Sequence, residues 1–156
     1  MILDLSALNE YVIGLAKALY TRGFDLPANP SGVRDASGKL RFTIRGVLRD
    51  DAGGHAEIVL AEIWSQVRDR FARQEYAYDL IDRPRNRRRA FHQHNGFLRR
   101  LVAVRVHEHC EEVLDRPACD HYLGHELPNG YLGLDLLIAA WVEPDRLGCG
   151  DLRCLG

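Results

Sequence analysis

Four of the seven histidines of this 156-residue chain fall within residues 92–109, in a segment from Asp82 to His125 that is also rich in arginine. Imidazole titrates near neutral pH, so two such rings can serve as acid and base in one reaction. Arginine stabilises charge that builds up on a phosphoryl group through forked hydrogen bonds. Together they suffice for metal-independent cleavage of RNA, in which the 2′-hydroxyl attacks its own phosphate. The candidate catalytic residues are His92, His94, His107, His109, Arg88 and Arg105.

Strand periodicity predicts which of these side chains share a face of a sheet. In an expected strand over 101–109 the valines take the even positions, so the basic residues at odd positions face the other way. Asn95-Gly96 is a strong signal for a two-residue hairpin turn, which would pair His94 with Phe97. One polar face would then carry Arg88, His92, His94, Arg99, Arg105, His107 and His109.

The same tight turn creates a difficulty for a shared site. It sets His92 and His94 beside the turn, whereas His107 and His109 lie near the far end of the returning strand. At about 3.3 Å per residue the two pairs would be too distant to act together. A joint site therefore needs a longer connection than Asn95-Gly96, or a different strand order.

Further arginines flank the histidines and could contact the phosphates of a nucleic-acid backbone. A solvated turn is the alternative interpretation of the same run. The net charge of −1 excludes a chain that clamps nucleic acid by its overall charge. The candidate nucleic-acid-binding residues are Arg83, Arg85, Arg87, Arg89, Arg99 and Arg100.

Zinc-ligand types occur toward the C-terminus, although their spacing matches no tight pair of Cys-x2-Cys knuckles. In a cytosolic chain, cysteines are more often free thiols or metal ligands than disulfides. We assign no metal to the catalytic set. A structural zinc could be held by residues drawn from Cys110, Cys119, His121, Cys149 and Cys154.

The positioning elements follow from hydrophobic periodicity. Apolar residues at helical spacing predict an N-terminal helix from Ser6, a reasonable cap, to Tyr20, with a stop at Gly23. Residues 25–39 are rich in proline and glycine and predict a loop. Alternating residues predict a hairpin of strands 41–48 and 55–67 around a turn at 50–54, then strands 75–81, 87–94 and 101–109, with a turn at 82–86.

Residues 110–130 are expected to be loop-rich, and a helix around Tyr131–Trp141 should end before Pro144. This order predicts an α+β fold, an antiparallel sheet of about five strands flanked by an N-terminal and a C-terminal helix. We expect one domain over residues 1–156, with the N-terminal helix within 1–24, the sheet at 41–109, the C-terminal helix at 130–143 and a tail at 144–156.

Carboxylates on the middle strands are expected to form a solvated sheet face that pairs with the arginines. These are Glu57, Glu62, Glu75 and Asp79. Glu108 lies between two histidines of a strand and should therefore point to the opposite side. Tyr76, Tyr78 and Leu80 should share a face that is turned toward the core.

The overall composition is that of a globular protein, with 46% hydrophobic and 28% charged residues. No apolar run approaches the length of a membrane span. An acidic residue, Asp4, stands where a signal peptide needs a basic region. We therefore expect a cytoplasmic protein.

Part of the chain, roughly Leu40 to Cys110, resembles the TumE-type toxins of bacterial toxin–antitoxin pairs. The resemblance is carried by a first hairpin, a tyrosine-rich strand Tyr76–Leu80, and two successive strand ends, His92-Gln-His94 and His107-Glu-His109. It implies an intracellular toxin that acts on RNA or translation and is neutralised by an antitoxin. The Asp-Asn-Ala-Pro stretch of that family is replaced here by Arg88-Arg-Ala-Phe.

Three functions follow as hypotheses. The first is a toxin-like ribonuclease that uses the His/Arg set on RNA and binds a protein partner, an antitoxin. The second is a non-enzymatic, zinc-stabilised interaction subunit of a larger complex. The third is a nucleic-acid-binding accessory protein without catalysis.

Overall fold

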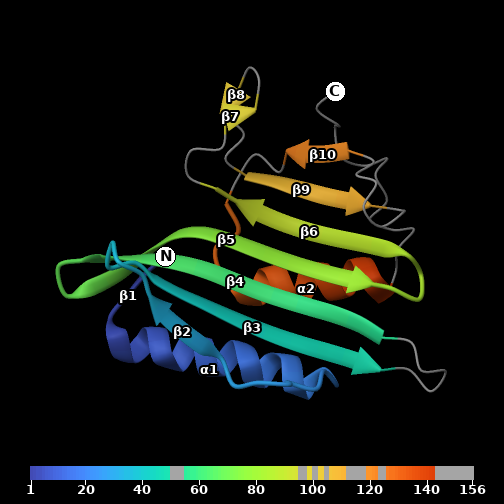
Figure 1. Ribbon diagram of the computed structural model, residues 1–156, viewed down its shortest axis with the longest axis horizontal. Coiled ribbons are helices and arrows are strands. Elements are labelled where there is room, and N and C mark those ends of the chain that lie inside the picture. The colour runs from blue at the N-terminus through green and yellow to red at the C-terminus, as the bar shows by residue number, and fades with distance from the viewer. Residues whose placement is uncertain are drawn as a thin grey trace.

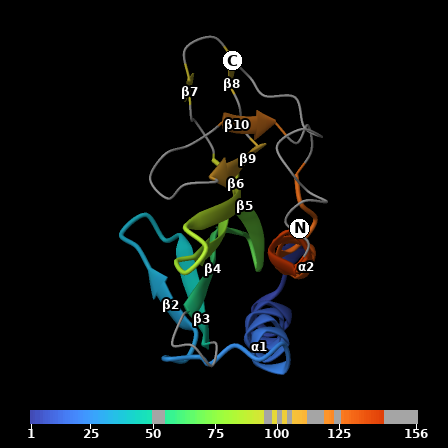
Figure 2. The same cartoon turned by 90° about the vertical axis from the view of Figure 1, so that its right-hand side faces the viewer.

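An antiparallel sheet with two helices on one face forms the protein (Figures 1 and 2). The computed structural model describes residues 1–49, 55–94, 98–99, 102–103, 106–111, 119–122 and 126–142. Within these residues seven strands follow one another in the order β10-β9-β6-β5-β4-β3-β2, and β1 also pairs with β5. The α+β class is confirmed, whereas the expected number of about five strands is wrong.

The long strands are β3 (Leu40–Arg49), β4 (His55–Val67) and β5 (Arg70–Asp82), followed by β6 (Arg87–Gln93) and β9 (Val106–Glu111). The predicted bounds of β4 are confirmed, and β5 begins five residues before the predicted Glu75. The turn between β5 and β6 is also confirmed, with Asn86 in the left-handed region at φ 55°.

Short strands account for the remaining members of the sheet. These are β1 (Ile2–Leu3), β2 (Ser31–Arg34) and β10 (Cys119–Tyr122). β2 and β10 lie at the two ends of the strand order, where residues 25–39 and 110–130 were expected to form loops. The loop predictions are wrong at these positions because an edge strand is held by backbone pairing to one neighbour and needs no apolar alternation.

The expected strand 101–109 is divided in two. β7 (Leu98–Arg99) pairs with β8 (Val102–Ala103) as a separate two-stranded ribbon, and only β9 joins the main sheet. Val106 and Glu108 point to the helix-covered face and are buried, as the periodicity predicts. The predicted turns at 50–54 and at Asn95-Gly96, the residues Val104 and Arg105, and the predicted tail 144–156 lie outside the described residues.

Helix α1 (Leu5–Thr21) begins at Asp4, whose Oδ1 accepts a hydrogen bond from the amide of Ala7 at 2.8 Å. The predicted cap at Ser6 is therefore wrong by two residues, and Ser6 lies inside the first turn. Gly23 follows the helix with φ 86°, a conformation that favours glycine, so the predicted stop is confirmed.

Helix α2 (Gly130–Val142) confirms the predicted C-terminal helix. It lies close to the sheet because Gly133 has no side chain: a Cβ there would stand 2.3 Å from Cδ2 of Tyr78. None of the helices in the described ranges is long and apolar enough to cross a membrane.

The core fills the space between the two helices and the sheet (Figure 2). Each fully buried leucine or isoleucine there contributes about 1.5–3 kcal/mol. Even positions of β4 and, beyond the β-bulge between the two strands, even positions of β5 from Tyr76 onward face this core. This confirms the placement of Tyr76, Tyr78 and Leu80. Within the described residues the other face of the sheet carries no helix, and it is called the open face below.

Candidate functional site

The pairing of β6 with β9 decides whether the histidines meet. His92 lies opposite His107 and Ala90 opposite His109, so the predicted register, with His94 paired to Phe97, is wrong. The physical reason is that the chain between β6 and β9 is long enough to include the β7–β8 ribbon, so the strands are not joined by a tight turn. The observed register preserves the parity of the prediction, and it removes the separation that a tight hairpin would impose.

A carboxylate, a guanidinium and an imidazole form the centre of the open face. Nε2 of His92 lies 3.1 Å from Oδ2 of Asp79. Nε and Nη2 of Arg88 donate to Oδ1 of Asp79 at 3.0 and 2.5 Å. Asp79 stands on β5, the other two on β6, and all three occupy positions whose side chains leave the sheet on the same side.

Burial alone would raise the pKa of Asp79. The hydrogen bond from His92 and the positive charges of His92 and Arg88 outweigh that effect, and the pKa lies below its ordinary value. Asp79 is therefore ionised at neutral pH. An ionised carboxylate on an imidazole fixes the orientation of the ring and favours one tautomer.

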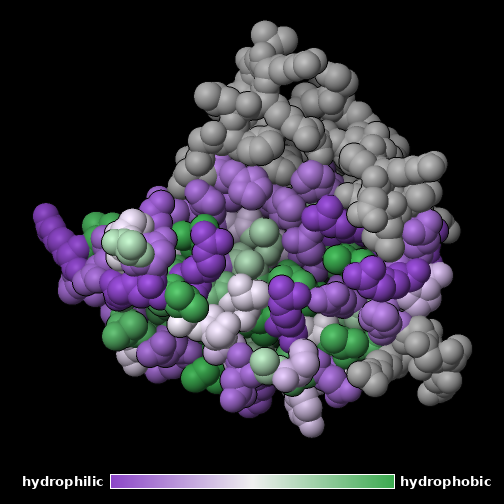
Figure 3. All heavy atoms as spheres, in the orientation of Figure 1, coloured by the Kyte–Doolittle hydropathy of each residue, from purple (hydrophilic) through white to green (hydrophobic). Residues whose placement is uncertain are grey.

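Two further histidine rings surround His92. The ring centroid of His109 lies 4.8 Å from that of His92, and the centroid of His94 lies at 5.4 Å. Burial and the nearby charge of His92 lower the pKa of His94 below its ordinary value of 6.5. We call the set Asp79, Arg88, His92, His94 and His109 the His92 cluster; Figure 3 shows hydrophilic side chains gathered over the strands of this face.

The remaining candidate catalytic residues have no described side chain. His107 lies opposite His92 in the backbone register, and only this position is described. Arg105 lies outside the described residues. The cluster thus unites four of the six predicted catalytic residues and adds Asp79, which was expected only as a carboxylate paired with an arginine.

The predicted phosphate-binding arginines do not form one surface. Arg83, in the β5–β6 turn, is exposed, and Arg87 is half-buried. Arg85 donates to Asp82 Oδ2 at 3.1 Å, and its guanidinium lies 5.7 Å from the ring of Trp141. Arg100 lies outside the described residues, and Arg99 is described only by its backbone.

Arg89 is turned to the helix-covered face, where it is buried and pairs with Glu108. It is therefore removed from any phosphate-binding strip on the open face. Burial raises the pKa of Glu108 to about 7, although the positive charge of Arg89 opposes this rise. The prediction that Glu108 points away from the histidines is confirmed.

Glu62 corrects the prediction that the middle carboxylates are all solvated. It is 1% exposed, on the core side of β4. Oε1 accepts from the hydroxyl of Tyr11 at 2.7 Å and from that of Tyr78, and Oε2 accepts from Nε1 of Trp64 at 2.9 Å. Nη1 of Arg73 lies 3.4 Å from Oε1.

The same network anchors the start of α2. The hydroxyl of Tyr11 accepts from the amide of Gly130 at 2.7 Å, and Arg73 donates to the carbonyl of Leu127. Burial raises the pKa of Glu62, and Arg73 and the hydrogen-bond donors oppose that rise. Tyr11, Tyr78, Trp64 and Arg73 all direct donors at this carboxylate, so we assign the network a structural role.

Strand alternation predicts the face of both Glu62, which was expected to be solvated, and Asp79, which was not included among the catalytic residues. Glu62 shares its parity with Ile58, Leu60 and Trp64, all buried, so alternation alone places it in the core. Asp79 has the opposite parity to Tyr78 and Leu80 on β5, so alternation places it on the open face.

The possible zinc ligands are described only by their backbone. Cys119 lies opposite Cys110, and His121 lies opposite Glu108, in the β9–β10 register. Cys149 and Cys154 lie outside the described residues. Within the described part of the chain, no group of three or more His, Cys, Asp or Glu side chains is placed to hold a metal ion.

No protein-family model, curated protein or solved structure matches the chain. The likeness to TumE-type toxins stays a prediction carried by the sequence motifs.

Proposed function

We propose that the His92 cluster is the acid–base site of a toxin-like, metal-independent ribonuclease. The observation that supports this proposal most is the convergence of two histidine rings, His94 directly after β6 and His109 on β9, on the imidazole of His92, which Asp79 holds. Neither the core nor strand pairing requires two imidazoles with centroids 4.8 and 5.4 Å from that of a third. Such a group supplies an acid and a base for one reaction.

The base in this mechanism is His94. Its lowered pKa keeps the ring neutral at neutral pH, so it can accept the proton of the 2′-hydroxyl. The freed oxygen attacks the adjacent phosphorus and forms a 2′,3′-cyclic phosphate. The bond from phosphorus to the 5′-oxygen of the next nucleotide breaks, and that oxygen leaves with a proton from an acid.

The acid is His92, because an adjacent carboxylate compensates the positive charge of an imidazolium. Asp79 also holds the ring in one orientation through the contact at Nε2. His109 lies against His92 and completes the wall of the site. Arg88, with a side chain 27% exposed, supplies a guanidinium beside the phosphoryl oxygens.

Cleavage of cellular RNA would arrest growth, so a chain of this kind requires control. We include in the proposal a cytoplasmic location and a protein antitoxin as partner, both of which the motif resemblance implies. We expect Arg83, which is exposed in the β5–β6 turn, to contact the backbone of a bound RNA. Arg87 has the strand parity of Arg89 and leaves the sheet on the helix-covered side, so it is not part of this contact.

The experiment compares expression and RNA cleavage for the wild type, His92→Ala and His55→Ala. His55 is an exposed histidine at the start of β4 and serves as the matched control. We expect the wild type to inhibit growth on expression. The purified wild type should cleave RNA to products with 2′,3′-cyclic phosphate ends, also when a metal chelator is present. His92→Ala should lower the cleavage rate by about 10²–10⁴, whereas His55→Ala should leave it within about twofold.

A harmless wild type that leaves RNA intact would refute the proposal, as would cleavage that His92→Ala does not reduce. RNA binding that weakens steeply with salt, without cleavage, would favour the accessory nucleic-acid-binding function instead.

A zinc-stabilised interaction subunit is the second candidate. The observation that favours it is the β9–β10 register, which brings Cys110 and Cys119 to facing positions from a separation of nine residues in sequence. One zinc per purified chain, lost in Cys119→Ala, would support this function. Purified protein without metal would exclude it.

A further inference from the structure

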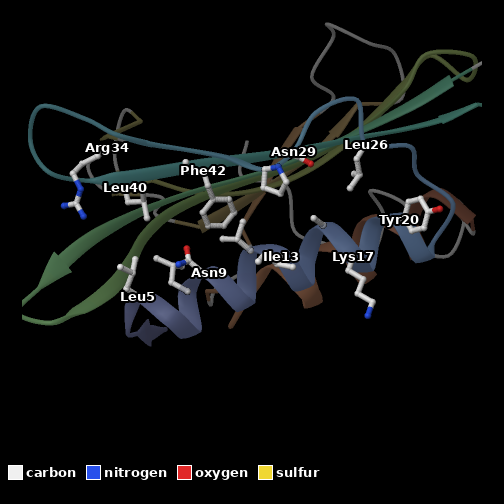
Figure 4. A pocket seen from close by; sticks show the side chains of 15 residues that line it. Leu5, Asn9, Ile13, Lys17, Tyr20, Leu26, Asn29, Arg34, Leu40 and Phe42 are labelled. Carbon is white, nitrogen blue, oxygen red and sulfur yellow. The ribbon is translucent and has the colours of Figure 1, made fainter.

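A groove runs along α1 on the side of the molecule away from the His92 cluster (Figure 4). It has a volume of about 870 Å³ and lies between α1 and the strands β2 and β3. Its floor is apolar, formed by Leu8 and Val12 of α1 and by Leu40 and Phe42 of β3. Figure 4 shows Arg34 and Leu40 at one end and Tyr20 at the other.

Large apolar side chains remain exposed along this groove. Leu5 is 53% exposed, Ile13 64% and Tyr20 68%, all on α1 and all lining it. Single exposed apolar residues are ordinary on protein surfaces, but a row of them over a concave apolar floor marks an interaction site. Polar groups on the lining are few, which leaves apolar contact as its main source of binding energy.

The β2 edge suggests the conformation of the occupant. In the described part of the chain, β2 has β3 on one side and no strand on the other. All four of its residues are exposed. Gly32 and Arg34 line the groove, whereas Val33 between them points to the other side of the strand. An extended segment can therefore pair with the β2 backbone and direct alternate side chains onto the floor.

Charge defines the chemistry of that segment further. Two charged residues line the groove, Lys17 and Arg34, and both are basic. Arg34 donates to the carbonyl of Gly38 and to Gln66 Oε1, which are neutral groups. Within the described residues neither cation has a carboxylate partner, so an acidic residue on the occupant would find an uncompensated charge.

We propose that this groove binds an extended segment of a partner protein, with apolar residues at alternate positions and an acidic residue that pairs with Arg34. The groove lies at the β2 end of the strand order and on the helix-covered face, whereas the His92 cluster lies on the open face at β5, β6 and β9. The inference rests on the groove alone and does not require the chain to be a ribonuclease.

Gly32 provides the decisive variant. A Cβ at this position would meet Leu40 Cδ1 at 3.6 Å, an ordinary contact, so a larger side chain can enter the groove without disturbing the backbone. Gly32→Phe should obstruct the groove beside β2. Val33→Phe adds a ring of the same size on the opposite face of the same strand. A matching melting temperature for the two variants shows that both fold.

The experiment selects binders from a random peptide library displayed on phage against the whole chain. We expect enriched peptides that alternate apolar residues and contain Asp or Glu. A synthetic enriched peptide should bind Gly32→Phe at least about tenfold more weakly and Val33→Phe within about twofold in fluorescence anisotropy. When the selection is repeated against the double variant Lys17→Glu, Arg34→Glu, the enriched peptides should no longer favour Asp or Glu.

Three results would overturn the proposal. The first is a selection without enrichment, and the second is a set of peptides whose binding Gly32→Phe leaves unchanged. The third is a wild type that sediments as a dimer and a Gly32→Phe variant that sediments as a monomer, because a second copy would then occupy the groove. A loss of RNA cleavage in the His92→Ala variant affects none of these readouts.

Discussion

Glu62→Gln is expected to destabilise the protein by about 3–5 kcal/mol, because it removes the charge that a buried arginine faces. The side chain of Arg73 is 2% exposed and that of Glu62 is fully buried, so solvent cannot replace the lost partner. The amide also turns a donor toward groups that now donate to Oε1 or Oε2, including Trp64 Nε1 at 2.9 Å. The tyrosines cannot supply a negative charge in this variant, since burial, the largest cause, raises the pKa of Tyr11 and Tyr78 above the ordinary value.

Urea unfolding followed by tryptophan fluorescence measures this loss, and Trp64 provides a probe in contact with the site. For a domain of this size a loss of 3–5 kcal/mol corresponds to a fall in melting temperature of about 6–20 °C. Glu57→Gln is the matched control on the same strand. Glu57 pairs with Arg45, which is 61% exposed, so its loss should stay below about 1 kcal/mol.

The double variant Glu62→Gln, Arg73→Met separates the charge effect from the packing effect. If the unpaired guanidinium causes the loss, the double variant should be less destabilised than the sum of the two single variants. The assignment of Glu62 as the centre of a structural network would be refuted if Glu62→Gln lowered the free energy of unfolding no more than Glu57→Gln does. The comparison requires that the slope of that free energy against urea concentration is unchanged.

Three further predictions concern the scaffold. The folded state keeps a proton on Glu108 up to about pH 7, whereas the unfolded chain releases it near the ordinary value of 4.5. The folded state thus binds more protons in that window, so the wild type should lose stability as pH rises through it, and unfolding of Glu108→Gln should show a flatter pH dependence. Asp4→Ala should cost about 0.5–2 kcal/mol in urea unfolding, and Ser6→Ala about nothing; equal losses would contradict the observed cap. Gly133→Ala should cost about 1–3 kcal/mol, because its Cβ would overlap the ring of Tyr78, and an unchanged melting temperature would show that α2 shifts freely.

Local patterns were sufficient for the elements that form the core. Alternation located β4 to the residue and assigned Tyr76 and Tyr78 to the buried face, because one side of each strand must be apolar where helices cover it. Helical spacing likewise located α1 and α2. The short strands β2 and β10 were missed, since their pairing depends on a neighbour's backbone and leaves no periodic trace in the sequence.

The sequence by itself determined which residues could share the open face. Side chains alternate along a strand, so His92 and His94 lie on one side, and His109 joins them whenever even positions of the first strand pair with odd positions of the second. Only the tertiary structure decided that they meet. The register of β9 against β6 is set by the long connection and by the packing of Val106 and Glu108 on the helix-covered face, not by the local turn signal. The contact of Asp79 with His92 depends in turn on the β5–β6 register, which brings together two residues 13 positions apart in the chain. Distances between strands are properties of the whole sheet, and no single segment contains them.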